Sequence, residues 1–150
     1  MLLRTHLVFS IFIYALLFNF LEKKFLFFLF LIFAVCIVDI DSKNSKAGKS
    51  VLFRPIQFFT KHRGAFHTLL FCLIFSAIFY FADKNAGLGF FVGYMSHLIL
   101  DCFTKSGIKL FWPISNLKFG LGVKSGGLIE EICFVLLFLV DIGLFVKLMI

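Results

Sequence analysis

The stretch AGLGFFVGYMSHLILDCF, residues 86–103, decides the fold class, because it is apolar over the length of a membrane helix yet carries two ionisable side chains. Gly89, Gly93 and Ser96 are the small residues through which membrane helices approach one another closely. His97 and Asp101 are four positions apart, so they lie on one face of a helix. The stretch therefore predicts a packed membrane helix that presents a histidine and an aspartate together near its end.

The composition of the whole chain agrees with this prediction. Of its 150 residues 61% are hydrophobic, 25 are Phe, and the mean hydropathy is +1.05. A soluble domain of this size has too little interior for so much apolar side chain. We therefore expect an all-α fold, a polytopic membrane helical bundle built as a single domain over residues 1–150.

Apolar runs predict about five transmembrane helices. They lie at residues 5–21, 25–40, 66–82, 86–103 and 128–149. A full span needs about 20 apolar residues, with about 17 as a lower limit, so the first four are short spans. We expect no cleaved signal peptide, because the charged residues Glu22, Lys23 and Lys24 follow the first run where small residues would be needed.

The basic residues predict the orientation of the bundle. Two long loops, residues 41–63 and 104–127, together with Arg4 carry 11 of the 15 Lys and Arg residues. The positive-inside rule places these loops and the N-terminus in the cytoplasm, and the C-terminus outside if there are five spans. We expect a multi-pass protein of the inner (cytoplasmic) membrane whose partners are membrane lipids. Because topology accounts for the net charge of +7, no specific nucleic-acid partner is predicted.

The costly polar residues gather at the ends that this topology places on the cytoplasmic side. They include all four histidines of the chain and several carboxylates: His6, Asp39, Asp41, His62, His67, His97, Asp101, Glu130 and Glu131. Ionisable groups inside a membrane are costly and usually mark function. Such a set suffices for one or two divalent metal ions, and histidine-rich ligation favours Zn²⁺ over Mn²⁺ or Fe²⁺.

Ordinary explanations exist for several of these residues taken singly. His6 alone is typical of an interfacial histidine, Asp39 and Asp41 of a helix stop, and Glu130 of an acid at a helix N-terminus. His97 and Asp101 alone are compatible with a structural hydrogen-bonded pair. A small cation-binding channel or transporter, or a non-catalytic membrane protein, is the alternative function. Transporter sites usually lie near the bilayer midplane between inverted repeats, and the chain shows no internal repeat.

Five short motifs together resemble a known family. They are TH (5–6), DID (39–41), HRGAFHT (62–68), GYMSHLILDCFTKSGIKLFWP (93–113) and SGGLIEE (125–131), and the third and fourth are the specific ones. In this order they resemble the YdjM-like family of LexA-regulated inner-membrane proteins, described as membrane-bound metal-dependent hydrolases. The family is more distantly similar to zinc-dependent phospholipase C and P1-type nucleases, which are helical proteins that hold a cluster of zinc ions.

The resemblance implies which residues form the site. The implied metal ligands are among His6, Asp39, Asp41, His62, His67, His97, Asp101 and Glu130. Two positions depart from the family pattern: Ser42 stands where a histidine is usual, which removes one ligand, and Lys105 stands where proline is common.

The predicted chemistry is hydrolysis of a phosphoester or phosphodiester, with a phospholipid as the substrate that suits a site at the membrane face. Metal ions lower the pKa of a bound water toward about 7 and polarise a phosphoryl oxygen. Arg63, with Lys61 or Lys105, is expected to hold the phosphate through charge-assisted hydrogen bonds. One of the aspartates 39, 41 and 101 is expected to take the proton from water. The sequence leaves the substrate and the oligomeric state open.

Two further features have simple interpretations. Trp112, the only tryptophan, is expected to lie at the lipid headgroup boundary. The four cysteines lie in or beside apolar runs without paired spacing, which indicates core thiols rather than disulfides.

Overall fold

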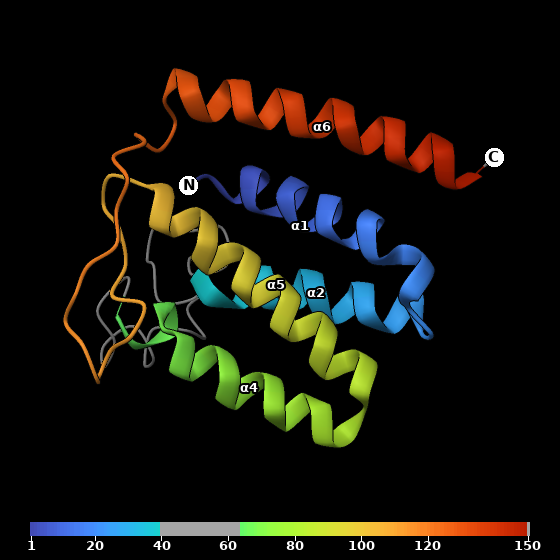
Figure 1. Cartoon of the computed structure of the whole chain (residues 1–150), viewed down its shortest axis with the longest axis horizontal. Helices are drawn as coiled ribbons and strands as arrows, with labels where there is room; N and C mark the ends of the chain where they lie inside the picture. The colour runs from blue at the N-terminus through green and yellow to red at the C-terminus, as the bar shows by residue number, and fades with distance from the viewer. Residues whose placement is uncertain (40–63, 150) are drawn as a thin grey trace, which may run out of the picture.

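All regular elements of the described chain are helical. A computed structural model describes residues 1–39 and 64–149, and Figure 1 shows their arrangement. The elements are α1 (Leu3–Leu17), the 3₁₀ turn η1 (Phe18–Phe20), α2 (Lys24–Val38), the 3₁₀ turn η4 (Ala65–His67), α4 (Leu69–Ala82), α5 (Lys84–Phe103) and α6 (Leu128–Met149). The predicted all-α class is confirmed.

Local capping residues determine where two of the helices begin. Thr68 caps α4, because its Oγ1 accepts a hydrogen bond from the Phe71 amide at 3.4 Å. Asp83 caps α5 by accepting from the amides of Asn85 and Ala86. Asp83 also pairs with Lys23 from the turn before α2, and this hydrogen bond is the main reason why the pKa of the Asp83 carboxyl lies below its usual value. The tight turn between α4 and α5 is thereby fixed against the turn between α1 and α2.

Helix α5 is the centre of the bundle and contacts α1, α2 and α4. Its glycines allow a close approach to α2: a Cβ at Gly89 would lie 3.0 Å from the carbonyl carbon of Phe27, and one at Gly93 would lie 2.9 Å from that of Leu31. The Oγ atoms of Ser96 and Ser10 lie 2.6 Å apart and join α5 to α1. The small residues in the stretch 86–103 are therefore contact points, as predicted.

Helix α6 occupies a peripheral position. It contacts α1 along one side, and Figure 1 shows it on the opposite side of the bundle from α4. Most of its large apolar side chains are exposed, among them Leu136, Leu139 and Phe145. An apolar outer face of this kind is what a lipid environment would cover.

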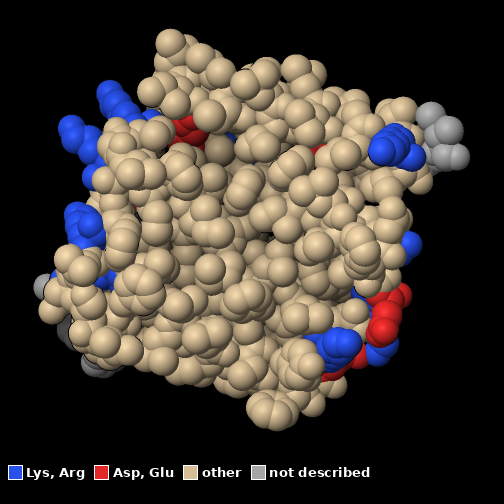
Figure 2. All heavy atoms as spheres, in the orientation of Figure 1, with Lys and Arg blue, Asp and Glu red and all other residues tan. Residues whose placement is uncertain are grey.

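Two of the described helices are long and apolar enough to cross a membrane. Among the described residues, two helices, Leu3–Phe20 and Lys84–Phe103, have the length and composition of a membrane span, whereas Lys24–Val38 and Leu69–Ala82 are apolar but shorter. Figure 2 shows that on one face the charged side chains lie near the two ends of the bundle and leave a wide uncharged surface between them. The arrangement of five spans stays a prediction.

Candidate metal centre

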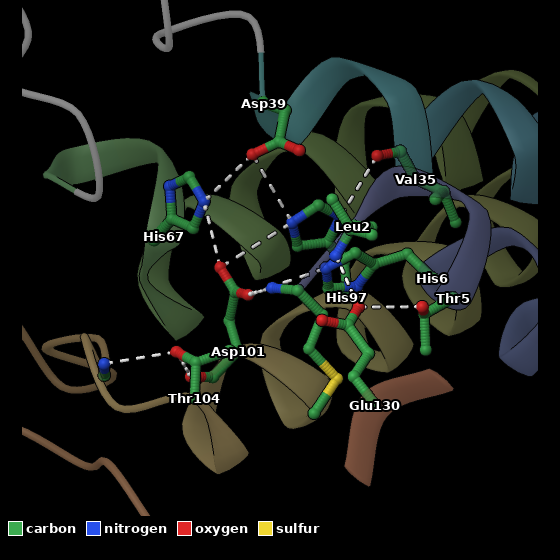
Figure 3. Close-up of polar contacts among 12 residues, drawn as sticks. Leu2, Thr5, His6, Val35, Asp39, His67, His97, Asp101, Thr104 and Glu130 are labelled. Atoms are coloured by element: carbon green, nitrogen blue, oxygen red, sulfur yellow. Dashed lines mark hydrogen bonds and ion pairs between the residues drawn. The ribbon is translucent and has the colours of Figure 1, made fainter. Parts of the chain in front are cut away.

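Histidine and aspartate side chains from the ends of four helices, α1, α2, α4 and α5, lie close together (Figure 3). His6 comes from the first turns of α1, Asp39 directly follows α2, and His67 belongs to η4 just before α4. His97 and Asp101 lie in the last turns of α5. The three histidines and Asp101 are buried, whereas the Asp39 side chain is 17% exposed. The structure thus gathers residues that are up to 95 positions apart in the sequence (His6 and Asp101).

Four of the donor atoms have the spacing of a metal coordination shell. His67 Nε2 lies 3.6 Å from Asp39 Oδ1 and 3.5 Å from Asp101 Oδ2. His97 Nε2 lies 3.7 Å and 3.9 Å from the same two oxygens. Tetrahedral zinc, with bonds of about 2.0–2.2 Å, keeps its ligand atoms roughly 3.3–3.6 Å apart. These nitrogen–oxygen distances are close to that separation, and the donor atoms of Asp39, His67 and His97 all lie within 4.8 Å of one another.

The orientation of His97 suits a metal ligand. Its Nδ1 lies 3.1 Å from the carbonyl oxygen of Val35 on α2, so Nδ1 carries the proton and donates it. Nε2 then presents a lone pair toward the carboxylates, and within the described ranges it has no hydrogen-bond partner although it is buried. A buried nitrogen without a partner is costly unless something binds it. Metal-ligating histidines typically have this backbone support on the second ring nitrogen.

A second set of donors shares residues with the first. His6 Nε2 lies 3.5 Å from Asp101 Oδ1, the oxygen that faces away from His67, and the terminal amine of Met1 lies 2.8 Å from the same oxygen. The His6 ring stacks on His97 with centroids 3.9 Å apart, and neither His6 nitrogen has a hydrogen-bond partner in the described part of the chain. The donor atoms of His6, His97 and Asp101 lie within 4.8 Å of one another. Asp101 therefore presents Oδ2 to His67 and His97 and Oδ1 to His6.

Glu130 lies close to the site but outside both donor sets. Its Oε1 accepts hydrogen bonds from the Leu2 amide at 2.6 Å and from Thr5 Oγ1 at 2.8 Å. Its Oε2 accepts from the Gly126 amide at 2.7 Å. These contacts tie the start of α6 to the residues directly before His6, so Glu130 positions α1. Its direct role as a ligand stays a prediction.

Some predicted site residues cannot be placed. Asp41, Lys61, His62 and Arg63 lie outside the described residues. Lys105 is described, and its side chain is exposed in the loop that follows α5.

Three supporting residues were not predicted. The Thr5 hydroxyl donates a hydrogen bond to Glu130 Oε1. Its position next to His6 was the only feature of the sequence that could have indicated this role. Thr104 Oγ1 donates to the Asp101 carbonyl oxygen at 2.7 Å and closes α5. The Tyr94 hydroxyl donates to the carbonyl of Phe66 and holds the backbone beside His67. Tyr94 lies three positions before His97, a spacing that could have indicated its shared face.

A helical membrane protein with a buried histidine–aspartate cluster is the class that fold and site define. The family described as "YdjM inner membrane protein" matches residues 1–148, and the chain belongs to this family.

Three relatives show how similar the chain is to known proteins. "Uncharacterized protein YvsG" of Bacillus subtilis (strain 168) is 38% identical over 101 residues, which cover 64% of this chain and 63% of the relative. "Inner membrane protein YdjM" of Escherichia coli (strain K12) and of Shigella flexneri are each 34% identical over 84 residues, or 50% of this chain and 43% of theirs. The matches thus span 43–63% of the relatives' own lengths. No solved structure matches the chain.

Proposed function

We propose that this protein is a membrane-bound, metal-dependent hydrolase of phosphoester or phosphodiester bonds. The observation that carries the proposal is the convergence of buried imidazole nitrogens and carboxylate oxygens 3.5–3.9 Å apart, with His97 Nε2 buried and lacking a hydrogen-bond partner in the described part. A purely structural cluster would be expected to satisfy that nitrogen by a hydrogen bond.

The residues of the site fit a divalent ion. Asp39, His67 and His97 would hold one ion, and His6, His97 and Asp101 form a second group that could hold one. When bound there, Zn²⁺ would supply Lewis acidity, which makes water a better nucleophile and polarises a phosphoryl oxygen.

The chain's own residues have separate roles in this proposal. His97 is held in one tautomer by the Val35 carbonyl, so its Nε2 stays aimed at the site. Helix packing excludes solvent from His67 and Asp101, while the partial exposure of Asp39 marks the side from which water and substrate enter. We assign phosphate binding to Arg63, together with Lys61 or Lys105, because a guanidinium matches phosphate geometry.

The proposal includes a location. The site lies at the same end of the bundle as the basic loop of residues 104–127, which follows directly after α5. Under the positive-inside rule that end faces the cytoplasm, with five spans and an external C-terminus. A phosphodiester at the membrane face, such as that of a phospholipid, is the substrate class that this location favours.

Metal content tests the proposal first. The purified protein in detergent, the variants His97→Ala and Asp101→Asn, and the control Asp141→Asn would be analysed by inductively coupled plasma mass spectrometry after incubation with Zn²⁺ or Mn²⁺. The control removes a different buried carboxylate, which lies on α6 and outside the cluster. We expect stoichiometric metal in the wild type and the control and its loss in both site variants, with all four folded by circular dichroism. Absence of metal from the reconstituted wild type would refute the proposal.

Hydrolysis is tested second, on the metal-loaded protein. Release of phosphate or of a phosphorylated headgroup from phospholipid micelles, phosphomonoesters and nucleotide diesters would be measured with wild type and His97→Ala. We expect turnover that depends on His97. A metal-loaded wild type that cleaves none of these esters would contradict hydrolysis and favour a cation-binding transporter.

A further inference from the structure

The loop between α5 and α6 is an ordered hairpin. The amide of Ile108 donates to the Phe119 carbonyl at 2.9 Å, and the Phe119 amide donates back to Ile108 at 2.8 Å. The amide of Lys105 donates to the Val123 carbonyl at 2.8 Å. Ile108 is buried in the core of the bundle, so the base of the hairpin is fixed and its tip projects outward.

The hairpin exposes apolar side chains that an aqueous loop would avoid. Ile114 is 92% exposed, Leu121 71% and Leu117 68%. Phe111 and Trp112 stand beside them and are also exposed. An exposed apolar cluster of this kind usually marks a surface that binds a membrane or a protein.

The charge of the hairpin is of one sign. Lys105, Lys109, Lys118 and Lys124 are all exposed, and residues 104–127 contain no Asp or Glu. Lys109 donates to Asn116 Oδ1 at 3.1 Å, and among residues 1–39 and 64–149 none of the four lysines forms an ion pair. Figure 2 shows Lys and Arg side chains gathered along the edge of the molecule where this loop lies.

The hairpin also lies at the end of the bundle that carries the histidine–aspartate cluster. The Leu69 amide, two residues after His67, donates to the Leu110 carbonyl at 2.8 Å. The Thr104 amide donates to the Asp101 carbonyl at 3.2 Å. The loop is thus attached to both sides of the histidine–aspartate cluster, at the end of the helices.

We propose that residues 104–124 form a binding surface for anionic phospholipid headgroups, with the apolar tip inserted among the upper acyl chains. Four exposed lysines complement the charge of such a leaflet, and exposed Ile, Leu and Trp side chains match its interfacial layer. An acidic protein would satisfy the lysines, but it would not account for the exposed apolar side chains at the tip. The surface does not depend on catalysis by the metal centre.

Trp112 provides a direct test, because it is the only tryptophan in the chain. The purified protein would be placed in nanodiscs of phosphatidylcholine alone or mixed with phosphatidylglycerol, each with or without lipids brominated near the top of the acyl chains. We expect Trp112 emission to shift to shorter wavelength and to be quenched roughly twofold more in the anionic discs, with the difference lost in high salt.

Two variants separate the contributions of charge and apolar contact. Lys105→Gln/Lys109→Gln/Lys118→Gln/Lys124→Gln should abolish the difference between the two lipid compositions. Ile114→Asp/Leu117→Asp should abolish quenching in both. The matched control Lys84→Gln/Lys147→Gln, which changes lysines outside the hairpin, should behave as wild type.

The wild-type comparison decides the proposal even if a variant does not fold. Equal quenching in neutral and anionic discs, or no quenching in either, would overturn it. Binding of an acidic protein without any response to anionic lipid would do the same.

Discussion

Replacing Gly93 by alanine should damage both the packing of α5 and the metal centre. A Cβ at this position would lie 2.9 Å from the carbonyl carbon and 3.0 Å from the Cα of Leu31 on α2. Carbon atoms prefer about 3.5–4.0 Å, so the two backbones must separate by roughly 0.5–1 Å. The neighbouring atoms are main chain and cannot move away by a side-chain rotation.

The free-energy cost follows from three contributions. Overpacking of this kind costs about 1–3 kcal/mol. One turn further on, the bond from His97 Nδ1 to the Val35 carbonyl is already 3.1 Å long, and the same separation would break it at a cost of about 0.5–1.5 kcal/mol. Alanine recovers up to about 1 kcal/mol through its higher helix propensity. With the full alanine gain, the net expectation is a protein about 0.5–3.5 kcal/mol less stable, with metal affinity lowered at least about tenfold because His97 loses its support.

The assay compares two glycine-to-alanine variants of the same protein. Gly143 in α6 has nothing within 4 Å of the position of a Cβ, so Gly143→Ala supplies the same chemical change without the clash. Thermal unfolding in detergent would be followed by circular dichroism, and zinc affinity by competition with a chromophoric chelator. If Gly93→Ala matched Gly143→Ala in both measurements, the close approach of α5 to α2 and its role in holding His97 would be refuted.

Three further predictions concern Glu130, Asp141 and the bound metal. Glu130→Ala removes the acceptor of two hydrogen bonds from the start of α1 and of one from Gly126, so the unfolding temperature should fall and zinc affinity should drop about 10–100-fold, whereas an unchanged affinity would show that Glu130 does not position His6. Asp141→Leu should raise the unfolding temperature, because Oδ1 of this buried carboxyl has no hydrogen-bond partner among the described residues, and a lower temperature would contradict that reasoning. Chelation of metal should lower the unfolding temperature of the wild type but leave that of His97→Ala unchanged, and an equal effect on both would place the metal elsewhere.

Much of the helical architecture could be predicted because it depends on local sequence. The predicted spans 86–103 and 128–149 correspond to helices at Lys84–Phe103 and Leu128–Met149. The predicted span 66–82 began too early: the cap at Thr68 starts the helix at Leu69, which leaves His67 in a 3₁₀ turn. That difference matters, because a residue before the helix can turn its side chain toward α5.

The hydrogen-bond partners of the site residues depend on long-range packing, which cannot be predicted from the sequence alone. That histidines and aspartates gather at one end followed from the order of spans. The acceptor for His97 Nδ1 is a main-chain carbonyl, and no residue type marks such a partner in advance. The contacts of Glu130 are likewise hidden, since Thr5 lies 125 positions away and only the packing of α6 on α1 brings the two together.

The pairing of the first helix with the last has a consequence for biosynthesis. Glu130 binds the Leu2 amide across 128 positions of the sequence, so this contact forms only after the start of α6 has been synthesised. Until α6 is made, α1 lacks the hydrogen bonds from Leu2 and Thr5 to Glu130 that orient His6. A chain arrested before α6 would therefore carry all four histidines yet lack the Glu130 contact that aligns the first of them.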